Sequence, residues 1–350
     1  MIHILSTKEE HLKEAGDYIK KGVPVIFPTE TVYGIGADGL WADSILRIFR
    51  AKGRPSDNPL ILHIAEKDAL RELGEEIPPY VDLLTDHFWP GPLSIVVKSS
   101  DKVPEVVRAG LSTVAIRMPK NGVARKIISH GGGVVAAPSA NVSGRPSPTS
   151  FEDALQDAQY MEAEHGIGEL AIVDGGQTKV GIESTVLLCT SYPPVILRPG
   201  KYTAEDIARL VGKCDVYHPK TSEERPQSPG MKYGHYMASK PTVLMDMAPE
   251  DTDQFLKKHG RESLRILFLA TTENQWEGAF YRKNLSSYEE PEVAAEAYFK
   301  ALREMDRQEG DLIVIQSCSR SGIGEALYER MKKSARGQVM KEDWDENWIW

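Results

Sequence analysis

A cation-rich loop followed by an apolar run carries the first chemical signal in this sequence. Lys52 and Arg54 flank a glycine, Asn58 lies among prolines, and the apolar run at residues 60–64 contains His63. Glycine and proline fix the shape of a loop, and two cations on such a loop suit an anion such as a phosphate. We expect the apolar run to form a buried strand. The alternative is a surface turn with a solvated lysine and arginine.

Hydroxyl, amide and cationic side chains recur beside other predicted strands. They are Thr29, Thr31, Thr113, Ser139, Asn141, Ser143, Ser147 and Ser184, with Arg117, Arg145 and Arg198. We expect all of them to follow strands, and ligands of open α/β sheets collect at the carboxyl ends of strands. Cations and hydroxyls without paired carboxylates favour a phosphate-bearing substrate over hydrolytic acid–base chemistry. The alternative is that these residues only form turns near prolines.

Other nucleotide and metal signatures are weak or missing. Residues 34–39 match G-x-G-x-x-G, but six residues separate them from the preceding predicted strand. The acidic residue about 20 positions on, Asp57, lies in a loop between prolines, so a nicotinamide site has little support. The sequence contains neither a P-loop motif nor an H-E-x-x-H motif.

An α/β framework is predicted to position these residues. Helices are expected at residues 9–21, 42–52, 65–75, 81–88 and 124–129, and strands at 23–27, 60–64, 93–98, 112–118, 134–137, 170–173, 184–188 and 195–197. Residues 28–37 are expected to form a loop. Further on, strands are expected at 242–247, 264–269 and 311–317, and helices at 291–305 and 324–335. Strands that alternate with helices predict a small, mostly parallel second sheet.

Length and composition favour two globular domains. We expect a larger first domain at 1–212, a linker at 213–240 with a net charge of +2, and a smaller domain at 241–350. The net charge of −9 argues against a basic nucleic-acid coat. Three widely spaced cysteines indicate neither a disulfide framework nor a zinc ribbon. The N-terminus does not read as a signal peptide and no run is long enough to span a membrane, so we expect a cytoplasmic protein.

Many segments of the chain resemble those of threonylcarbamoyl-AMP synthases, in the long two-domain form of the YrdC-like family. The matching segments are PTETVYGIGA, KGRPSDNPLILHI, FWPGPLSIVV, VAIRMP, APSANVSGRPSPT, DGG, VGIESTV, ILRPG, SPGMKYGHY and GIGEALYERMKKSA. The resemblance implies an N-terminal YrdC-like open twisted α/β sheet domain and a smaller Rossmann-like α/β domain. It covers nearly all of residues 5–210, the middle of the linker and part of the second domain.

The resemblance also implies a reaction. L-threonine and bicarbonate form a carbamate, which attacks the α-phosphate of ATP and releases pyrophosphate. A Mg²⁺ ion is expected on the triphosphate and not in a protein cage. The product, threonylcarbamoyl-AMP, passes to a complex that transfers the threonylcarbamoyl group to the tRNA adenosine next to the anticodon. A weak contact of this chain with tRNA itself is also expected, whereas binding to a membrane is not.

Residue roles follow from the same resemblance. The catalytic cations are Lys52 and Arg54. The ATP-binding residues are Arg54, Asn58, Thr113, Ser139, Asn141, Ser147, Arg198, Tyr233 and His235. The threonine-binding residues are Thr31, His63, Arg117, Ser184 and, through its backbone, Ala137. Arg117 is expected to pair bidentately with the threonine carboxylate. His63 has an alternative role as an ordinary strand histidine. Apart from the resemblance, the length of the linker and its net positive charge predict a lid over the nucleotide pocket, and the alternative is a flexible polar tether.

Two other functions stay open. One is a carbamoyl-adenylate-forming step of hydrogenase maturation, which uses a domain of the same fold. That system carries zinc-finger cysteine pairs and an acylphosphatase region, and this sequence has neither. The other is an RNA-binding module on the same scaffold. The acidic net charge and the nearly complete set of substrate positions argue against this module.

Overall fold

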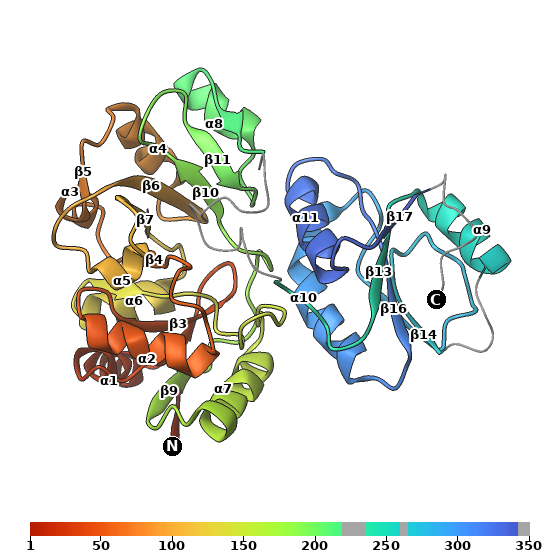
Figure 1. Cartoon of the computed structure of the whole chain (residues 1–350), viewed down its shortest axis with the longest axis horizontal. Helices are drawn as coiled ribbons and strands as arrows, with labels where there is room; N and C mark the ends of the chain where they lie inside the picture. The colour runs from red at the N-terminus through yellow and green to blue at the C-terminus, as the bar shows by residue number, and fades with distance from the viewer. Residues whose placement is uncertain (219–234, 260–264, 342–350) are drawn as a thin grey trace. The chain divides into compact units, whose positions relative to one another are not determined.

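The computed structural model describes residues 1–218, 235–259 and 265–341. Contacts between Cα atoms divide the chain into two compact units (Figure 1). The first unit contains Met1–Ser143 and Ser147–Tyr233, and the second contains Gly144–Pro146 and Gly234–Trp350. Among the described residues, no helix is both long and apolar enough to cross a membrane.

The first unit is built on a mixed sheet of twelve strands within its described residues. The strands are β1 (Ile2–Leu5), β2 (Val25–Pro28), β3 (Tyr33–Asp38), β4 (Ile61–Ile64), β5 (Gly74–Glu75), β6 (Leu93–Ser99), β7 (Thr113–Arg117), β8 (Val134–Ala136), β9 (Leu170–Val173), β10 (Thr185–Leu188), β11 (Val195–Arg198) and β12 (Asp215–Val216). Their order is β1-β9-β2-β3-β8-β4-β7-β6-β10-β11-β12, and β5 pairs with β6. The expected open α/β sheet is confirmed. Strand β12 lies inside the range predicted as linker and pairs with β11.

Eight helices accompany this sheet in the described part of the unit. They are α1 (Glu9–Lys20), α2 (Ala42–Lys52), α3 (Ala69–Leu73), α4 (Tyr80–Phe88), α5 (Glu105–Arg108), α6 (Gly122–His130), α7 (Phe151–His165) and α8 (Ala204–Val211). Helix α2 buries Ile45, Ile48 and Phe49 on one face and ends at Gly53, whose φ of 58° suits glycine. The end of the helix therefore places Lys52 and Arg54 on either side of a turn with a fixed shape.

The structure corrects two predictions about local structure. Residues 28–37 are not one loop, because β3 pairs antiparallel with β2 and leaves only Thr29–Val32 as the turn. Gly36 permits this pairing, since a Cβ there would lie 2.6 Å from the ring of Phe27. The helix expected over residues 65–75 is limited to α3, because Gly74 continues into β5.

Strand alternation gives the middle of the sheet two different faces. Leu62, Ile95, Ile116 and Leu187 belong to a large apolar core that also contains residues of α2, α3, α4, α5 and α8. Their neighbours along the strands point to the opposite face, because side chains alternate with a period of two. That face carries a small apolar cluster of Ile61, Val96, Ala115, Val186 and Leu197. We call it the polar face, because it also carries His63, Ser94, Arg117 and Ser184.

The second unit contains a five-stranded sheet in its described residues, and every pairing is parallel. The order is β15 (Tyr281–Asn284), β14 (Ile266–Ala270), β16 (Leu312–Gln316), β13 (Thr242–Met245) and β17 (Val339–Met340). Its helices are α9 (Pro249–His259), α10 (Pro291–Arg307) and α11 (Gly324–Ser334). The predicted parallel sheet and the helices that correspond to α10 and α11 are confirmed, whereas α9 and β15 were not predicted.

Candidate active site

The turn between β2 and β3 presents a fixed hydroxyl. Thr29 Oγ1 donates to the carbonyl of Val32 at 2.7 Å and accepts from the backbone N–H of Thr31 at 3.1 Å. Since the Thr29 proton is used in this way, Thr31 donates in the 2.8 Å bond between the two hydroxyls. Thr31 Oγ1 can then accept from Arg117 Nη2, which lies 3.1 Å away. The turn therefore aims Thr31 at the end of β7.

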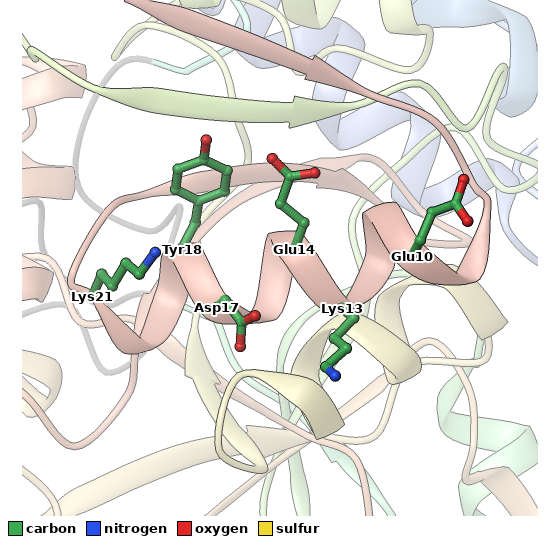
Figure 2. Close-up of a pocket in the computed structure, with 6 residues that line it drawn as sticks. All are labelled: Glu10, Lys13, Glu14, Asp17, Tyr18 and Lys21. Carbon is green, nitrogen blue, oxygen red and sulfur yellow. The ribbon is translucent and has the colours of Figure 1, made fainter.

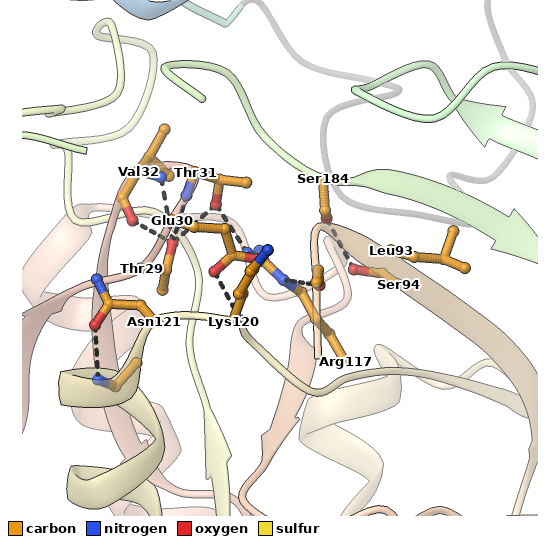
Figure 3. Close-up of polar contacts among 12 residues, drawn as sticks. Thr29, Glu30, Thr31, Val32, Leu93, Ser94, Arg117, Lys120, Asn121 and Ser184 are labelled. Atoms are coloured by element: carbon orange, nitrogen blue, oxygen red, sulfur yellow. Dashed lines mark hydrogen bonds and ion pairs between the residues drawn. The ribbon is translucent and has the colours of Figure 1, made fainter. Parts of the chain in front are cut away.

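Arg117 is held by a carboxylate that the sequence reasoning missed. Its Nη2 lies 2.7 Å from Glu30 Oε1, and both side chains are buried. Its Nε donates to the carbonyl of Gly91 at 3.4 Å, and Glu30 Oε2 accepts from the backbone N–H of Lys120 at 3.1 Å. Figure 3 shows this group at the β2–β3 turn. Glu30 stands between Thr29 and Thr31, but it was not predicted as a site residue, because a phosphate site is expected to contain cations and hydroxyls.

The engaged nitrogens restrict how Arg117 can meet a ligand. Nη2 and Nε already donate to protein oxygens, while Nη1 has no hydrogen-bond partner among the described residues. The bidentate pairing with a carboxylate stays a prediction. In the present arrangement Nη1 is the nitrogen that can offer a new hydrogen bond.

His63 presents a neutral ring on the polar face. In the sheet register it lies directly opposite Arg117. Burial, followed by the charge of Arg117, lowers the pKa of His63 to about 3. Its Nδ1 lies 3.2 Å from the carbonyl of Ile61, so the neutral ring donates there and keeps Nε2 as an acceptor. The ring can therefore accept a hydrogen bond from a hydroxyl or an amine.

Arg198 and Ser184, predicted for different substrates, contact each other. Arg198 Nε and Nη2 donate to the carbonyl of Ser184 at 3.1 and 3.0 Å, and Nη2 also lies 3.1 Å from Ser184 Oγ. Ser94 Oγ is 2.8 Å from the same hydroxyl. Ser94 was missed because it lies inside an apolar strand, where a single serine gives little signal.

Lys52 is turned towards backbone carbonyls. Its side chain is 1% exposed, and Nζ donates to the carbonyl of Ser139 at 2.5 Å and to that of Asn141. Its own carbonyl accepts from the backbone N–H of Ser143 at 3.0 Å. Ser139 Oγ in turn donates to Asn141 Oδ1 at 2.5 Å. Lys52 thus fixes the loop that follows β8, and its phosphate contact stays a prediction.

The loop before β4 contains an acceptor without a protein partner. Arg54 Nη2 donates to the carbonyls of Asn58 and Pro59 at 3.4 and 3.1 Å. Within the described residues, the buried Oδ1 of Asn58 has no hydrogen-bond partner. A buried polar atom of this kind requires an explanation, and a bound ligand or water would supply one.

The expectation that every polar residue follows a strand is wrong for two of them. Thr113 begins β7 and therefore lies four residues before Arg117, which is about 13 Å along the strand. Ser184 immediately precedes β10. The sheet is mixed, so amino and carboxyl ends of strands meet at the same edge, and the rule for parallel sheets does not apply to it.

Ser147 is paired with the second carboxylate that was missed. Its fully buried hydroxyl donates to Glu183 Oε1 at 2.7 Å. Glu183 directly precedes Ser184, so it connects a residue predicted to bind ATP to one predicted to bind threonine.

Ala137 continues from β8 and donates its N–H to the carbonyl of Ile61 at 3.1 Å. This bond places Ala137 beside β4, the strand that carries His63.

The remaining predicted residues belong to the linker. Tyr233 lies outside the described residues, as does most of the predicted lid. His235 falls in the second unit, where its ring lies 5.5 Å from that of Tyr236. Tyr236 packs on Phe299 of α10 at 5.1 Å. The nucleotide contact of His235 therefore stays a prediction.

A surface hollow along α1 is separate from these residues. Figure 2 shows the side chains that line it, which are Glu10, Lys13, Glu14, Asp17, Tyr18 and Lys21. None of them was predicted as a site residue. Mixed charges along one exposed helix face are typical of a solvated surface.

The buried carboxylates near the predicted site residues fit a magnesium ion bound to a phosphate better than one coordinated mainly by protein side chains. The described residues contain no group of three His, Cys, Asp or Glu side chains arranged to hold a metal. Two buried carboxylates beside predicted site residues, Glu30 and Glu183, already accept hydrogen bonds from Arg117 and Ser147. Mg²⁺ prefers phosphate oxygens and water with one or two carboxylates, so Mg²⁺ bound to ATP stays our proposal.

The mixed sheet, with cations and buried hydroxyls on the loops at its edges, defines an α/β protein. A family model described as "Telomere recombination", which groups Sua5, YciO and YrdC, matches residues 17–200. A second model, described as the C-terminal domain of threonylcarbamoyl-AMP synthase, matches residues 202–336. The chain belongs to the threonylcarbamoyl-AMP synthase family, as the resemblance predicted.

Similar proteins cover nearly the whole chain. A threonylcarbamoyl-AMP synthase of Pyrococcus abyssi is 39% identical over 342 residues, which is 95% of this chain and 96% of that protein. A threonylcarbamoyl-AMP synthase of Bacillus subtilis is 39% identical over 341 residues, with 96% of each chain covered. The crystal structure of P. abyssi Sua5 complexed with L-threonine superposes with a TM-score of 0.88 at 37% identity and covers 97% of this chain and 99% of that chain.

Proposed function

We propose that this protein condenses L-threonine, bicarbonate and ATP into threonylcarbamoyl-AMP and releases pyrophosphate. The observation that carries the proposal is the buried group of Arg117, Glu30 and Thr31, which offers Nη1 beside the neutral ring of His63. A fixed guanidinium suits a carboxylate, and an acceptor nitrogen suits a hydroxyl or an amine. The complex of the related P. abyssi protein with L-threonine supports an amino-acid substrate.

The nucleotide would bind at the two loops that contain Asn58 and Asn141. Arg54 stands on the first loop and Lys52 fixes the second. Transfer at a triphosphate consists mostly of positioning and charge neutralisation, so rigid loops with cations suit it. When bound, Mg²⁺ would neutralise the phosphate charge. The side chains of this chain would hold the nucleotide and the carbamate in line.

The fate of the product is also a proposal. Threonylcarbamoyl-AMP would be passed to a complex that modifies the tRNA adenosine next to the anticodon, in the cytoplasm. A weak contact of this chain with tRNA would accompany that transfer. No specific observation favours the RNA-binding module or the hydrogenase-maturation step.

Pyrophosphate release from ATP tests the proposal. We expect release only when L-threonine and bicarbonate are both present. Arg117→Ala should reduce it strongly, whereas the matched variant Arg71→Ala should not. Arg71 is exposed and pairs with Asp82 on the surface. Release that does not depend on threonine or on bicarbonate would refute the synthase function. Tight tRNA binding without turnover would favour the RNA-binding module.

A further inference from the structure

Glu30 is a buried carboxylate that uses both of its oxygens. Oε1 accepts from Arg117 Nη2 at 2.7 Å, and Oε2 accepts from the backbone N–H of Lys120 at 3.1 Å. The side chain is 9% exposed and that of Arg117 is 4% exposed. The carboxylate therefore joins three segments, which are the β2–β3 turn, the end of β7 and the loop that enters α6 (Figure 3).

The loop after β7 is fixed at its far end as well. Asn121 caps α6, because its Oδ1 accepts from the backbone N–H groups of Val123 and Ala124 at 2.9 and 3.3 Å. Lys120 lies between this cap and the strand that ends at Arg117. The backbone N–H of Lys120 donates to the Glu30 side chain, and this bond connects the loop to the turn that carries Thr31.

We propose that Glu30 is a positioning residue for the amino-acid subsite, an inference that rests on the proposed function. Glu30 acts through Arg117. By occupying Nη2, it sets the plane of the guanidinium and leaves Nη1 as the nitrogen that meets the substrate carboxylate. By holding Lys120, it keeps Thr31 and the end of β7 at a constant separation.

The geometry explains why a carboxylate is needed at this position. A buried guanidinium without a counter-charge is costly, and a neutral acceptor compensates it poorly. An arginine without Glu30 would turn to another partner or meet the substrate carboxylate in several orientations. A fixed guanidinium loses less conformational freedom when it binds a planar carboxylate, so affinity for the amino acid depends on this tie.

Equilibrium binding of L-threonine, measured by calorimetry, tests the proposal without requiring turnover. Glu30→Ala should weaken threonine binding on the order of 10- to 100-fold, and Glu30→Gln by a smaller factor, because the amide keeps one acceptor for Arg117. ATP binding should change less than about threefold, since no nucleotide residue contacts Glu30 in the described structure. Glu76→Ala is the matched control, since Glu76 is exposed and pairs with Lys98 at the surface.

A double-variant cycle separates positioning from general stability. If Glu30 acts through Arg117, then adding Glu30→Ala to Arg117→Ala should not weaken threonine binding further. Thermal unfolding shows whether each variant is folded, and Glu30→Gln serves if the alanine variant is not. Equal losses of ATP and threonine affinity, unchanged threonine affinity in a folded Glu30→Gln variant, or additive losses in the cycle would each overturn the proposal. A wild type that binds threonine but releases no pyrophosphate would overturn the proposed function and leave this inference standing.

Discussion

Replacing His63 with glutamine should remove a pH dependence of stability that the fold imposes. The ordinary pKa of a histidine is near 6.5, whereas burial and Arg117 lower that of folded His63 to about 3. Between these two pH values the unfolded chain binds a proton at this position and the folded chain does not. The free energy of unfolding therefore decreases as the pH falls from 6.5 to 3, by about 1.4 kcal/mol per pH unit.

The expected magnitude follows from that slope. Between pH 7 and pH 5 the wild type should lose about 2 kcal/mol through His63 alone. His63→Gln lacks this contribution but keeps all other titrating groups, so the difference in stability between wild type and variant should shift by that amount. Urea unfolding of the first unit at both pH values measures the shift, because the change in midpoint at constant slope reports stability.

Two outcomes would refute the reasoning. If the wild type and His63→Gln lose stability equally between pH 7 and pH 5, the histidine is not held neutral in the folded state. If the variant shows the steeper loss, His63 is protonated in the folded state and paired with an unidentified anion. The second result would also remove the acceptor role assigned to Nε2 of His63.

Three further predictions concern the ligands and the backbone around them. Arg54→Ala should weaken ATP binding by about 1.5–3 kcal/mol and Arg54→Lys by less, because lysine lacks the planar fork; unchanged ATP titrations would exclude the phosphate role. Gly200→Ala should lower the unfolding temperature and weaken threonine binding, since its Cβ would lie 2.3 Å from the backbone N of Thr185. The control Gly122→Ala, with open space around its Cβ, should do neither. L-Threonine should be turned over faster than L-valine, because valine lacks the hydroxyl and leaves hydrogen-bonding groups of the site unpaired. Equal turnover would show that Thr31 and His63 do not recognise the threonine hydroxyl.

The framework of the first unit could be predicted because its elements are locally consistent. Helix α2 combines a clear apolar face with a glycine at its end, and β4, β6 and β7 are apolar runs bounded by turn residues. Such signals depend only on neighbours along the chain. The family resemblance depended on short segments of the same loops and strands, so it assigned roles to residues without describing their contacts.

Other features depended on distant contacts and could not be predicted. The sheet is mixed because antiparallel pairings, such as β3 with β8 and β6 with β7, occur beside parallel ones such as β4 with β7. No single segment of the sequence reveals this combination. Helices α7 and α8 were missed, although Ser150 caps the first and Thr203 forms a capping box with Asp206 in the second. Those caps were detectable signals that the sequence reasoning did not use.

The buried cations show that the type of a residue does not by itself reveal whether it contacts a ligand or other residues of the protein. Lys52, Arg117 and Arg198 each donate to oxygens of their own chain, on Asn141, Glu30 and Ser184 respectively. A positive charge in a buried site must first be solvated by the protein, because isolated burial is costly. The oxygens that solvate it lie on the loops that carry the hydroxyls, so each cation also fixes the position of those hydroxyls. Arg198 and Ser184 illustrate the consequence, since a residue assigned to the nucleotide holds the backbone of one assigned to the amino acid. The two proposed subsites are therefore linked by the hydrogen bonds between Arg198 and Ser184, and a substitution at either residue should be measured against both substrates.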